Sequence, residues 1–263
     1  MRRSFGAVLC LVAAACGTPS ARHLHSVLPV AQCVPKPCGE YPGWKEQGDH
    51  CVPAGKTTLL RGETRELTGD SIVPQVTLRF LDNDSAEPLP LCAKSDDNGL
   101  FEIPEMPLGL TVAVVTSADG YVSVYHFNMN YSAPATAMAS WLEQYYILSA
   151  INYRMAGGYA FAPVKGKSIL AGKVFRNSDP QLFGGGTVAA RGEDLPTYYV
   201  GMMHIPVRGG TLSDATGDFL IPQANPGRHT LDVSYGGKTV GSARVLSFPD
   251  TVSFTYITAV VVK

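Results

Sequence analysis

A ten-residue phrase occurs twice in this chain, and no other sequence feature constrains the fold as strongly. The first copy is Ser95–Pro104 and the second is Ser213–Pro222, and both fit the pattern S-D-x-x-G-x-F-x-I-P. The spacing between the copies is kept as far as Gly109 and Gly227. A repeat of this kind predicts two related structural units within the 263 residues.

Each residue type in the phrase has a physical role. The aspartate can accept a hydrogen bond from the backbone two residues on, which favours a turn, and Asn98-Gly99 is typical of a tight hairpin. The phenylalanine and isoleucine stand two apart, so they point to one face of a strand. The proline has no N–H to donate and is expected to end that strand. Each copy therefore predicts a hairpin, a strand, a loop and a second strand, at Thr111–Val115 and Thr230–Ser234.

The first 32 residues predict export and anchoring. Arg2 and Arg3 precede an apolar run that ends at Ala15, which is typical of a signal peptide over residues 1–15 and is too short to span a membrane. Cys16 follows three alanines as in a lipobox, so we expect it to be lipidated, although Ala13 stands where that pattern prefers leucine. Ordinary cleavage that leaves Cys16 as a plain thiol is the alternative. Residues 16–32 are polar and lack periodicity, as a tether does.

Four further cysteines predict two disulfides. Cys33, Cys38 and Cys51 lie in a short module, residues 33–65, that has too little apolar material for a core of its own, and Cys92 lies in the first repeat unit. An even number in an exported chain implies two bridges with three possible pairings. We expect one bridge to connect the module to the first unit. A zinc site that uses these cysteines and His50 is the alternative, but the spacing matches no usual zinc finger.

Alternating β-prone segments fill both halves of the remaining chain. We expect a first antiparallel β-sandwich over residues 66–131 and a second over 167–263. Each carries its own strands and turns, so each is expected to fold alone. Residues 132–166 predict a helical connector, because Ser140 to Glu143 form a capping box and apolar residues recur from there to Ile151 at helical spacing.

The second unit resembles the carboxypeptidase regulatory-like domain, a transthyretin-like β-sandwich found in many bacterial surface proteins. The residues that carry the resemblance are Gly172, Asp214, Gly217, Phe219, Ile221, Pro226 and Gly227, and more loosely Asp96, Gly99, Phe101, Ile103 and Gly109. The whole arrangement also resembles uncharacterised lipoproteins of the myxobacterial kind. The resemblance implies two tandem transthyretin-like sandwiches and a surface setting, and it implies no catalytic residue.

No motif for catalysis or metal binding is found in the sequence. None of the six histidines begins the H-x-x-E motif of a metallocarboxypeptidase, and the only H-x-H, at His23, lies in the tether. Tyr198 and Tyr199 are adjacent on an expected strand, so they point to opposite faces and cannot share a metal. The strands that follow the phrase lack the glutamate that assists Lys–Asn crosslinks in pilin-type domains. We therefore expect no enzyme, no metal and no cofactor, and the net charge of −1 gives no general attraction to nucleic acid.

The sequence thus predicts a non-catalytic, lipid-anchored protein of the cell envelope, placed in the outer membrane, with a structural or binding role. Its expected partners are the membrane, through Cys16, and a protein or carbohydrate at the cell surface. The alternative is a carbohydrate-binding or adhesive protein in which Tyr198, Tyr199 and Tyr235 are exposed and stack on sugar rings. A calcium site at Asp82 and its neighbours is less favoured than an ordinary turn, because the usual loop glycine is missing.

Overall fold

The part of the protein that the structure describes is mostly β-structure, which confirms the predicted mostly-β class. The computed structural model describes residues 37–48, 50–131, 143–150, 163–176, 181–201, 206–213 and 216–260. In these ranges no helix is long and apolar enough to cross a membrane. The signal segment, the tether, Cys16 and Cys33 lie outside the described residues.

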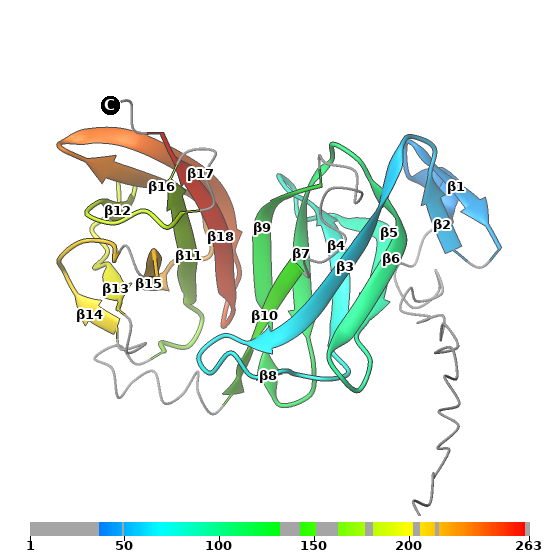
Figure 1. The fold of residues 1–263 in the computed structure, drawn as a ribbon, viewed down its shortest axis with the longest axis horizontal. Coiled ribbons are helices and arrows are strands. Elements are labelled where there is room, and N and C mark those ends of the chain that lie inside the picture. Colours follow the sequence, from blue (N-terminus) through cyan, green and yellow to red (C-terminus); the bar gives the residue numbers. More distant parts are fainter. Residues whose placement is uncertain are drawn as a thin grey trace, which may run out of the picture.

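The first half of the molecule, here called the N-lobe, is a sandwich of two sheets (Figure 1). Its strands are β3 (Thr57–Glu66), β4 (Thr77–Asp82), β5 (Pro88–Lys94), β6 (Leu100–Pro107), β7 (Thr111–Ser117), β8 (Tyr121–Val122), β9 (Val124–Asn130) and β10 (Glu143–Ser149). One sheet has the order β5-β4-β7-β9 and the other has the order β6-β3-β10-β8. Between them lies an apolar core that includes Phe80, Phe101, Ile103 and Tyr145.

The second half, here called the C-lobe, is built in the same way. Its strands are β11 (Ser168–Arg176), β12 (Thr187–Ala190), β13 (Tyr198–Val200), β14 (Pro206–Arg208), β15 (Asp218–Ala224), β16 (Gly227–Tyr235), β17 (Lys238–Ser247) and β18 (Val252–Ala259). The sheet β14-β13-β15-β11-β18 faces the sheet β12-β16-β17. The core between them includes Leu170, Phe183, Phe219 and Leu231.

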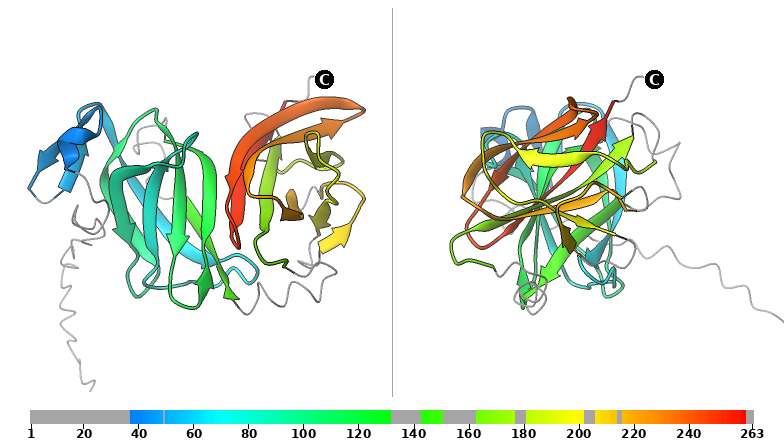
Figure 2. Two further views of the ribbon diagram at one scale, coloured as in Figure 1. Left: turned by 180° about the vertical axis from the view of Figure 1, so that it is seen from behind. Right: turned by 90° about the vertical axis from the view of Figure 1, so that its left-hand side faces the viewer.

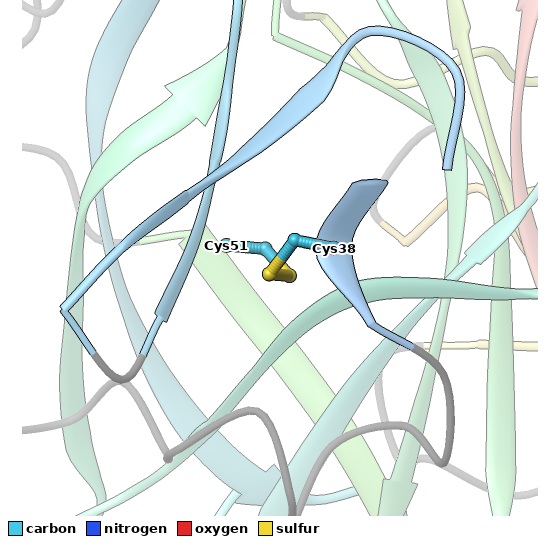
Figure 3. The surroundings of a disulfide bond; sticks show 2 residues. All are labelled: Cys38 and Cys51. Atoms are coloured by element: carbon cyan, nitrogen blue, oxygen red, sulfur yellow. A yellow bond between two sulfur atoms is a disulfide. The ribbon is translucent and has the colours of Figure 1, made fainter. Parts of the chain in front are cut away.

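A small cysteine module lies at the end of the N-lobe that is remote from the C-lobe (Figures 1 and 2). It consists of a 3₁₀ turn, η1 (Cys38–Glu40), and the hairpin of β1 (Trp44–Gln47) and β2 (His50–Pro53). A disulfide joins Cys38 to Cys51, whose Cα atoms are 5.4 Å apart (Figure 3). The zinc alternative is therefore wrong for these two cysteines, because a disulfide sulfur is no thiolate ligand.

The turn at the start of the repeated phrase forms as its residues predict. Asp96 Oδ1 accepts hydrogen bonds of 2.8 Å from the backbone N–H groups of Asn98 and Leu100. Gly99 has φ +72° and its counterpart Gly217 has φ +63°, a conformation that glycine adopts at little cost. The phenylalanine and isoleucine of both copies are buried.

Two expectations drawn from the phrase are wrong. The turn is not a hairpin, because β5 and β6 lie in opposite sheets and the turn carries the chain from one to the other. The prolines also do not end the strands, since β6 continues past Pro104 and β15 past Pro222. In both strands the register shifts at the proline, so each proline occupies a β-bulge, where no N–H is needed for the ladder.

The predicted helix over the connector is wrong where the structure describes it. Residues Glu143–Ser149 form β10, which pairs in parallel with β3. The physical reason is that the segment is a strand with apolar residues on both faces. Tyr145 and Ile147, two residues apart, point into the N-lobe, whereas Leu148 on the other face packs towards the C-lobe. Burial on both faces places apolar side chains at spacings that also fit a helix. Strand β3 begins in residues 33–65, the segment that the sequence assigned to the cysteine module, but it belongs to a sheet of the N-lobe.

The two lobes share one sheet. Strand β18 pairs in parallel with β9, from Val252 opposite Val124 to Thr255 opposite Phe127, which makes a continuous nine-stranded sheet (Figure 1). An apolar cluster, here called the joint cluster, covers this junction. It comprises Val124, Leu148, Ile169, Ala171, Tyr198, Val252 and Phe254. The C-lobe core is also completed by three N-lobe side chains: Leu81, Ala113 and Phe127.

Candidate functional site

The most elaborate polar contact between the lobes centres on Asn128. This residue has φ +62° and lies next to a register shift in β9, so its side chain projects towards the C-lobe. Its amide nitrogen donates to the carbonyl oxygen of Arg244 at 3.0 Å and to the hydroxyl of Thr255 at 2.9 Å. Its backbone N–H donates to Asn83 Oδ1 at 2.7 Å. Asn128 therefore ties the β4–β5 turn of the N-lobe to β17 and β18.

A groove of about 180 Å³ lies beside this contact, between the β4–β5 turn and strands β16 and β17. It is lined by Asn83, Asp84, Arg228, His229, Thr230, Arg244, Val245 and Leu246. Arg228 Nη2 donates to the carbonyl oxygen of Asp84 at 2.8 Å, so the turn of one lobe holds a guanidinium of the other. Among the described residues, no carboxylate lies within 4.0 Å of the guanidinium nitrogens of Arg228 or Arg244.

His229 belongs to a cluster with the composition of a catalytic triad. Its Nδ1 lies 2.6 Å from Glu193 Oε1 and its Nε2 lies 2.9 Å from Ser247 Oγ. The Nε2 also lies 2.8 Å from the carbonyl oxygen of Asn225, which can only accept a hydrogen bond. Nε2 therefore carries a proton and cannot take one from the serine. Ser247 in turn donates to the same carbonyl, at 2.8 Å.

The cluster consequently serves as a structural brace. A general base needs a free lone pair within reach of the nucleophile, and His229 has none on its serine side. Both His229 and Ser247 are buried, and their bonds connect β16, β17 and the loops at Glu193 and Asn225. The arrangement satisfies buried polar groups, which would otherwise cost about 1–3 kcal/mol each.

His126 plays a comparable part in the N-lobe. Its ring is fully buried between Tyr145, Tyr146 and Phe254, and its Nε2 lies 2.9 Å from the carbonyl oxygen and 3.1 Å from the nitrogen of Tyr146. Thr116 also donates to that carbonyl, at 2.7 Å. Side chains of β7 and β9 thus reach across the sandwich to hold β10. Burial lowers the pKa of His126 to about 4, so the ring is neutral at pH 7, and burial raises the pKa of Tyr146 to about 12.

The three tyrosines proposed for sugar stacking do not share an exposed face. Tyr198 and Tyr199 are buried, whereas Tyr235 is 44% exposed and contacts Phe183 edge to face. Tyr198 belongs to the joint cluster and Tyr199 to the C-lobe core, so they point to opposite faces as their spacing predicts. The Tyr199 hydroxyl accepts from the backbone N–H of Val188 at 2.8 Å and so covers the free edge of β12.

The structure gives no support to metal binding in the part of the chain that it describes. Nowhere in that part do three or more His, Cys, Asp or Glu side chains gather closely enough to hold an ion. Asp82 Oδ1 accepts from the backbone N–H and hydroxyl of Ser85, both at 2.8 Å, as in an ordinary turn. The hydroxyl is the main cause that lowers the pKa of Asp82.

Lysine and asparagine do meet in the C-lobe, where Lys167 Nζ donates to Asn225 Oδ1. Asn225 is exposed and Lys167 is partly buried. No carboxylate contacts this pair among the hydrogen bonds and salt bridges of the described residues, so the contact is a surface hydrogen bond between the start of β11 and the loop before β16.

Sequence reasoning missed Asn128, Arg228, Arg244 and the His229 cluster. One signal was present for Arg228. The residues of β16 alternate, so Arg228 and Thr230 lie on one face of the strand and the buried His229 and Leu231 lie on the other. Asn128 also directly follows the β-prone run Tyr121–Phe127, and asparagine in a strand suggests a bulge. The pairing of Glu193 with His229 leaves no local pattern, because the two come from separate segments.

Comparisons with known proteins give only distant structural neighbours. No protein-family model matches the chain, and no curated protein matches it. The Bacillus anthracis TIE protein aligns with 78% of this chain and 34% of its own length, at 13% identity and a TM-score of 0.26. This chain therefore spans about a third of that one.

Two pilin structures align over similar lengths. The shaft pilin SpaA of Lactobacillus rhamnosus GG covers 79% of this chain and 99% of its own, at 9% identity and a TM-score of 0.23. A variant of the major pilin of Streptococcus pyogenes covers 79% and 100%, at 10% identity and a TM-score of 0.21. Scores this low leave the function of the chain to be inferred from its own residues.

Proposed function

We propose that the chain is a non-catalytic, lipid-anchored protein of the cell envelope, in which two transthyretin-like sandwiches act as a rigid structural or binding module. The nine-stranded sheet shared by both lobes carries this proposal. Domains joined only by a linker are expected to move relative to one another unless a large apolar interface holds them. Here backbone pairing and the joint cluster both oppose such motion.

The polar chemistry is consistent with that role. The cluster with the composition of a triad has a structural role, because His229 Nε2 donates to the carbonyl oxygen of Asn225 and therefore cannot act as a base towards Ser247. The carbohydrate-binding alternative loses its support, because stacking on a sugar needs exposed rings and the rings of Tyr198 and Tyr199 are buried.

The anchor rests on the sequence around Cys16, and changing that residue tests it. We expect Cys16→Ser to release the chain into the soluble fraction without altering its melting temperature, because the sequence predicts a polar tether, outside both sandwiches, over residues 16–32. Cells that carry each form are fractionated and extracted with a phase-separating detergent. Cys10→Ser is the matched control, since Cys10 leaves with the signal peptide. A soluble wild type with an unmodified N-terminal Cys16 would show that the chain is simply secreted.

We further propose that Cys33 pairs with Cys92 and so fastens the module to the N-lobe. Cys92 is buried and disulfide-bonded, and Cys38 is already bonded to Cys51. Peptide mapping of the unreduced mature protein should yield a Cys33–Cys92 peptide and no alkylated cysteine among these four. A Cys92 that is alkylated without reduction, or that is bonded to another chain, would contradict the pairing.

A further inference from the structure

We propose that the groove between the β4–β5 turn and strands β16 and β17 binds a compact oxyanion, a carboxylate or a phosphate group carried on a ligand of about the size of one sugar ring. The proposal names a ligand class for the binding role suggested above. It does not depend on the lipid anchor, and its test uses purified protein in solution, so either idea can fail alone.

The first argument is the charge of the groove. Arg228 and Arg244 both line it, and Asp84 is its only carboxylate. Thr230 stands opposite Arg244 in the β16–β17 ladder and Leu246 stands opposite Arg228, so the two arginines lie diagonally on the same face of the two strands. Guanidinium groups in this relation can converge on one anion, and each offers donors in a planar fork that fits carboxylate and phosphate oxygens.

The second argument is preorganisation. Exposed arginines usually lose side-chain entropy when they bind, and this loss weakens binding. Arg228 is already held by the carbonyl oxygen of Asp84, 2.8 Å from its Nη2, and this bond leaves its other N–H groups available. The turn that supplies the carbonyl is itself fixed, because Asp82 caps it and Asn83 bonds to Asn128.

The third argument is the absence of an internal counter-ion. Arg61, Arg65 and Arg191 each pair with a carboxylate at 2.5–2.9 Å. In the described part of the chain, Arg228 and Arg244 have no such partner within 4.0 Å. Two guanidinium groups on neighbouring strands of the C-lobe, with no carboxylate among the described residues within 4.0 Å of either, favour an external anion.

The size of the groove limits the ligand. Pockets for drug-sized molecules are about 300–1,000 Å³, and this groove is about 180 Å³. A single anionic group with a small ring fits such a volume, whereas a long polymer would contact it only at one unit.

The test is a titration of the purified full-length mature protein at an ionic strength of about 0.15 M. Calorimetry and NMR monitor the binding. The probes are inorganic phosphate, D-glucuronate and, as the uncharged control, D-glucose. Saturable binding of phosphate or glucuronate without binding of glucose is expected. If only phosphate binds, the ligand carries a phosphate group. If only glucuronate binds, the ligand is a carboxylated sugar. Equal responses to all three probes, or no response to either anion, would overturn the proposal.

Variants then locate the site. Arg228→Gln and Arg244→Gln should each weaken binding about tenfold or more, because each removes charge-assisted hydrogen bonds. Arg208→Gln, on the remote edge strand β14, is the matched control and should bind like the wild type. Unchanged binding by the double variant Arg228→Gln/Arg244→Gln would overturn the assignment.

Two further substitutions keep the test decisive if an arginine variant folds poorly. Thr230→Glu keeps both arginines and places a carboxylate between them, so it should abolish binding. Asp84→Asn removes the only carboxylate of the groove but keeps the carbonyl that holds Arg228, so binding should tighten about two- to threefold. A purely structural role for the arginines predicts no gain from Asp84→Asn, and the absence of that gain would count against the site.

Discussion

The N-lobe and the C-lobe share the same arrangement of strands around the ten-residue phrase, and this likeness extends beyond the phrase itself. In the N-lobe, β3 lies between the phrase strand β6 and the parallel strand β10; in the C-lobe, β11 lies between β15 and the parallel strand β18. The register is also equivalent, since Gly62 stands opposite Phe101 and Gly172 stands opposite Phe219. Strand β10 is therefore the counterpart of β18, not a connector.

The lobes differ in what meets the outer edge of that last strand. The edge of β10 pairs with only two residues of β8, and the side chains of His126 and Thr116 also contact its backbone. The edge of β18 instead pairs with β9 of the other lobe over four residues. The difference shows how two repeated units form one rigid structure. The N-lobe covers the edge of β10 with its own short strand β8, whereas the C-lobe uses the equivalent edge of β18 to pair with the N-lobe.

The largest expected effect is the loss of folding when the lobes are separated. A fragment of residues 163–263 would lack β9 beside β18 and would expose much of the joint cluster, at about 1.5–3 kcal/mol for each side chain that loses its burial. It would also lack Leu81, Ala113 and Phe127 from its core. These losses together are comparable with a typical total stability of about 5–15 kcal/mol.

We therefore expect the fragment to show no cooperative melting transition and the full chain to unfold in one transition. Near-UV circular dichroism and calorimetry of both proteins measure this. A fragment that melts cooperatively near the temperature of the intact chain would restore the sequence-based expectation that each sandwich folds alone.

Acid should loosen the N-lobe edge more than its counterpart in the C-lobe. Because burial lowers the pKa of His126 from 6.5 to about 4, the unfolded chain binds a proton between these pH values that the folded chain excludes. The stabilisation is complete above pH 6.5 and is lost as the pH falls towards 4, by up to about 3 kcal/mol.

Hydrogen exchange at pH 7 and pH 5 tests this difference between the lobes. The amides of β10 should lose more protection than those of β18, and the pH dependence should be weaker in His126→Gln. The comparison with the variant removes the contribution of carboxylates that titrate in the same range. An identical pH dependence in both proteins would contradict a role for the histidine.

The sequence predicted the fold well where a local pattern had a single meaning. The Asp96 turn, the buried Phe–Ile pairs and the opposite faces of Tyr198 and Tyr199 all follow from short-range stereochemistry, and they are found. The helix over Glu143–Ser149 was predicted wrongly because a strand buried on both faces places apolar side chains at helical spacing as well.

The joint and the groove could not be predicted, because they depend on long-range pairing. Nothing near Val124 indicates that its strand meets Val252, and nothing near Asp84 indicates that its carbonyl holds Arg228. The prolines were misassigned for a related reason. A proline lacks the N–H that a ladder needs, so it either ends a strand or lies at a bulge. The pairing register with the partner strand, β3 or β11, decides between the two outcomes, and the local sequence does not contain it.

Alanine at the paired glycines should cost more in the C-lobe than in the N-lobe. A Cβ on either residue would overlap the phenylalanine opposite it and a carbonyl of the parallel strand, Glu143 for Gly62 and Thr255 for Gly172. Overpacking of this kind costs about 1–3 kcal/mol. Gly172→Ala should lie at the upper end, because displacing β18 also disturbs its pairing with β9.

Urea unfolding of the two variants measures this difference. Gly201→Ala is the control, since a Cβ there meets nothing within 4 Å. Equal losses for Gly62→Ala and Gly172→Ala would mean that the junction adds nothing to the cost of moving the strand.

The smallest expected effect concerns the polar bond between the lobes at Asn128. Asn128→Gly keeps the positive φ but removes the amide that donates to Arg244 and Thr255. It also removes the oxygen that accepts from Asn83 Nδ2 at 3.2 Å within the N-lobe. Two hydrogen bonds that are partly accessible to water should contribute about 1–2 kcal/mol together, well below the apolar joint cluster. Asn130→Ala, at the exposed end of the same strand, is the control, because its bond to Thr111 stays within one lobe. The groove lies beside this bond, so Asn128→Gly should also weaken oxyanion binding slightly. A stability loss no larger than that of Asn130→Ala would show that strand pairing and apolar burial alone hold the lobes together.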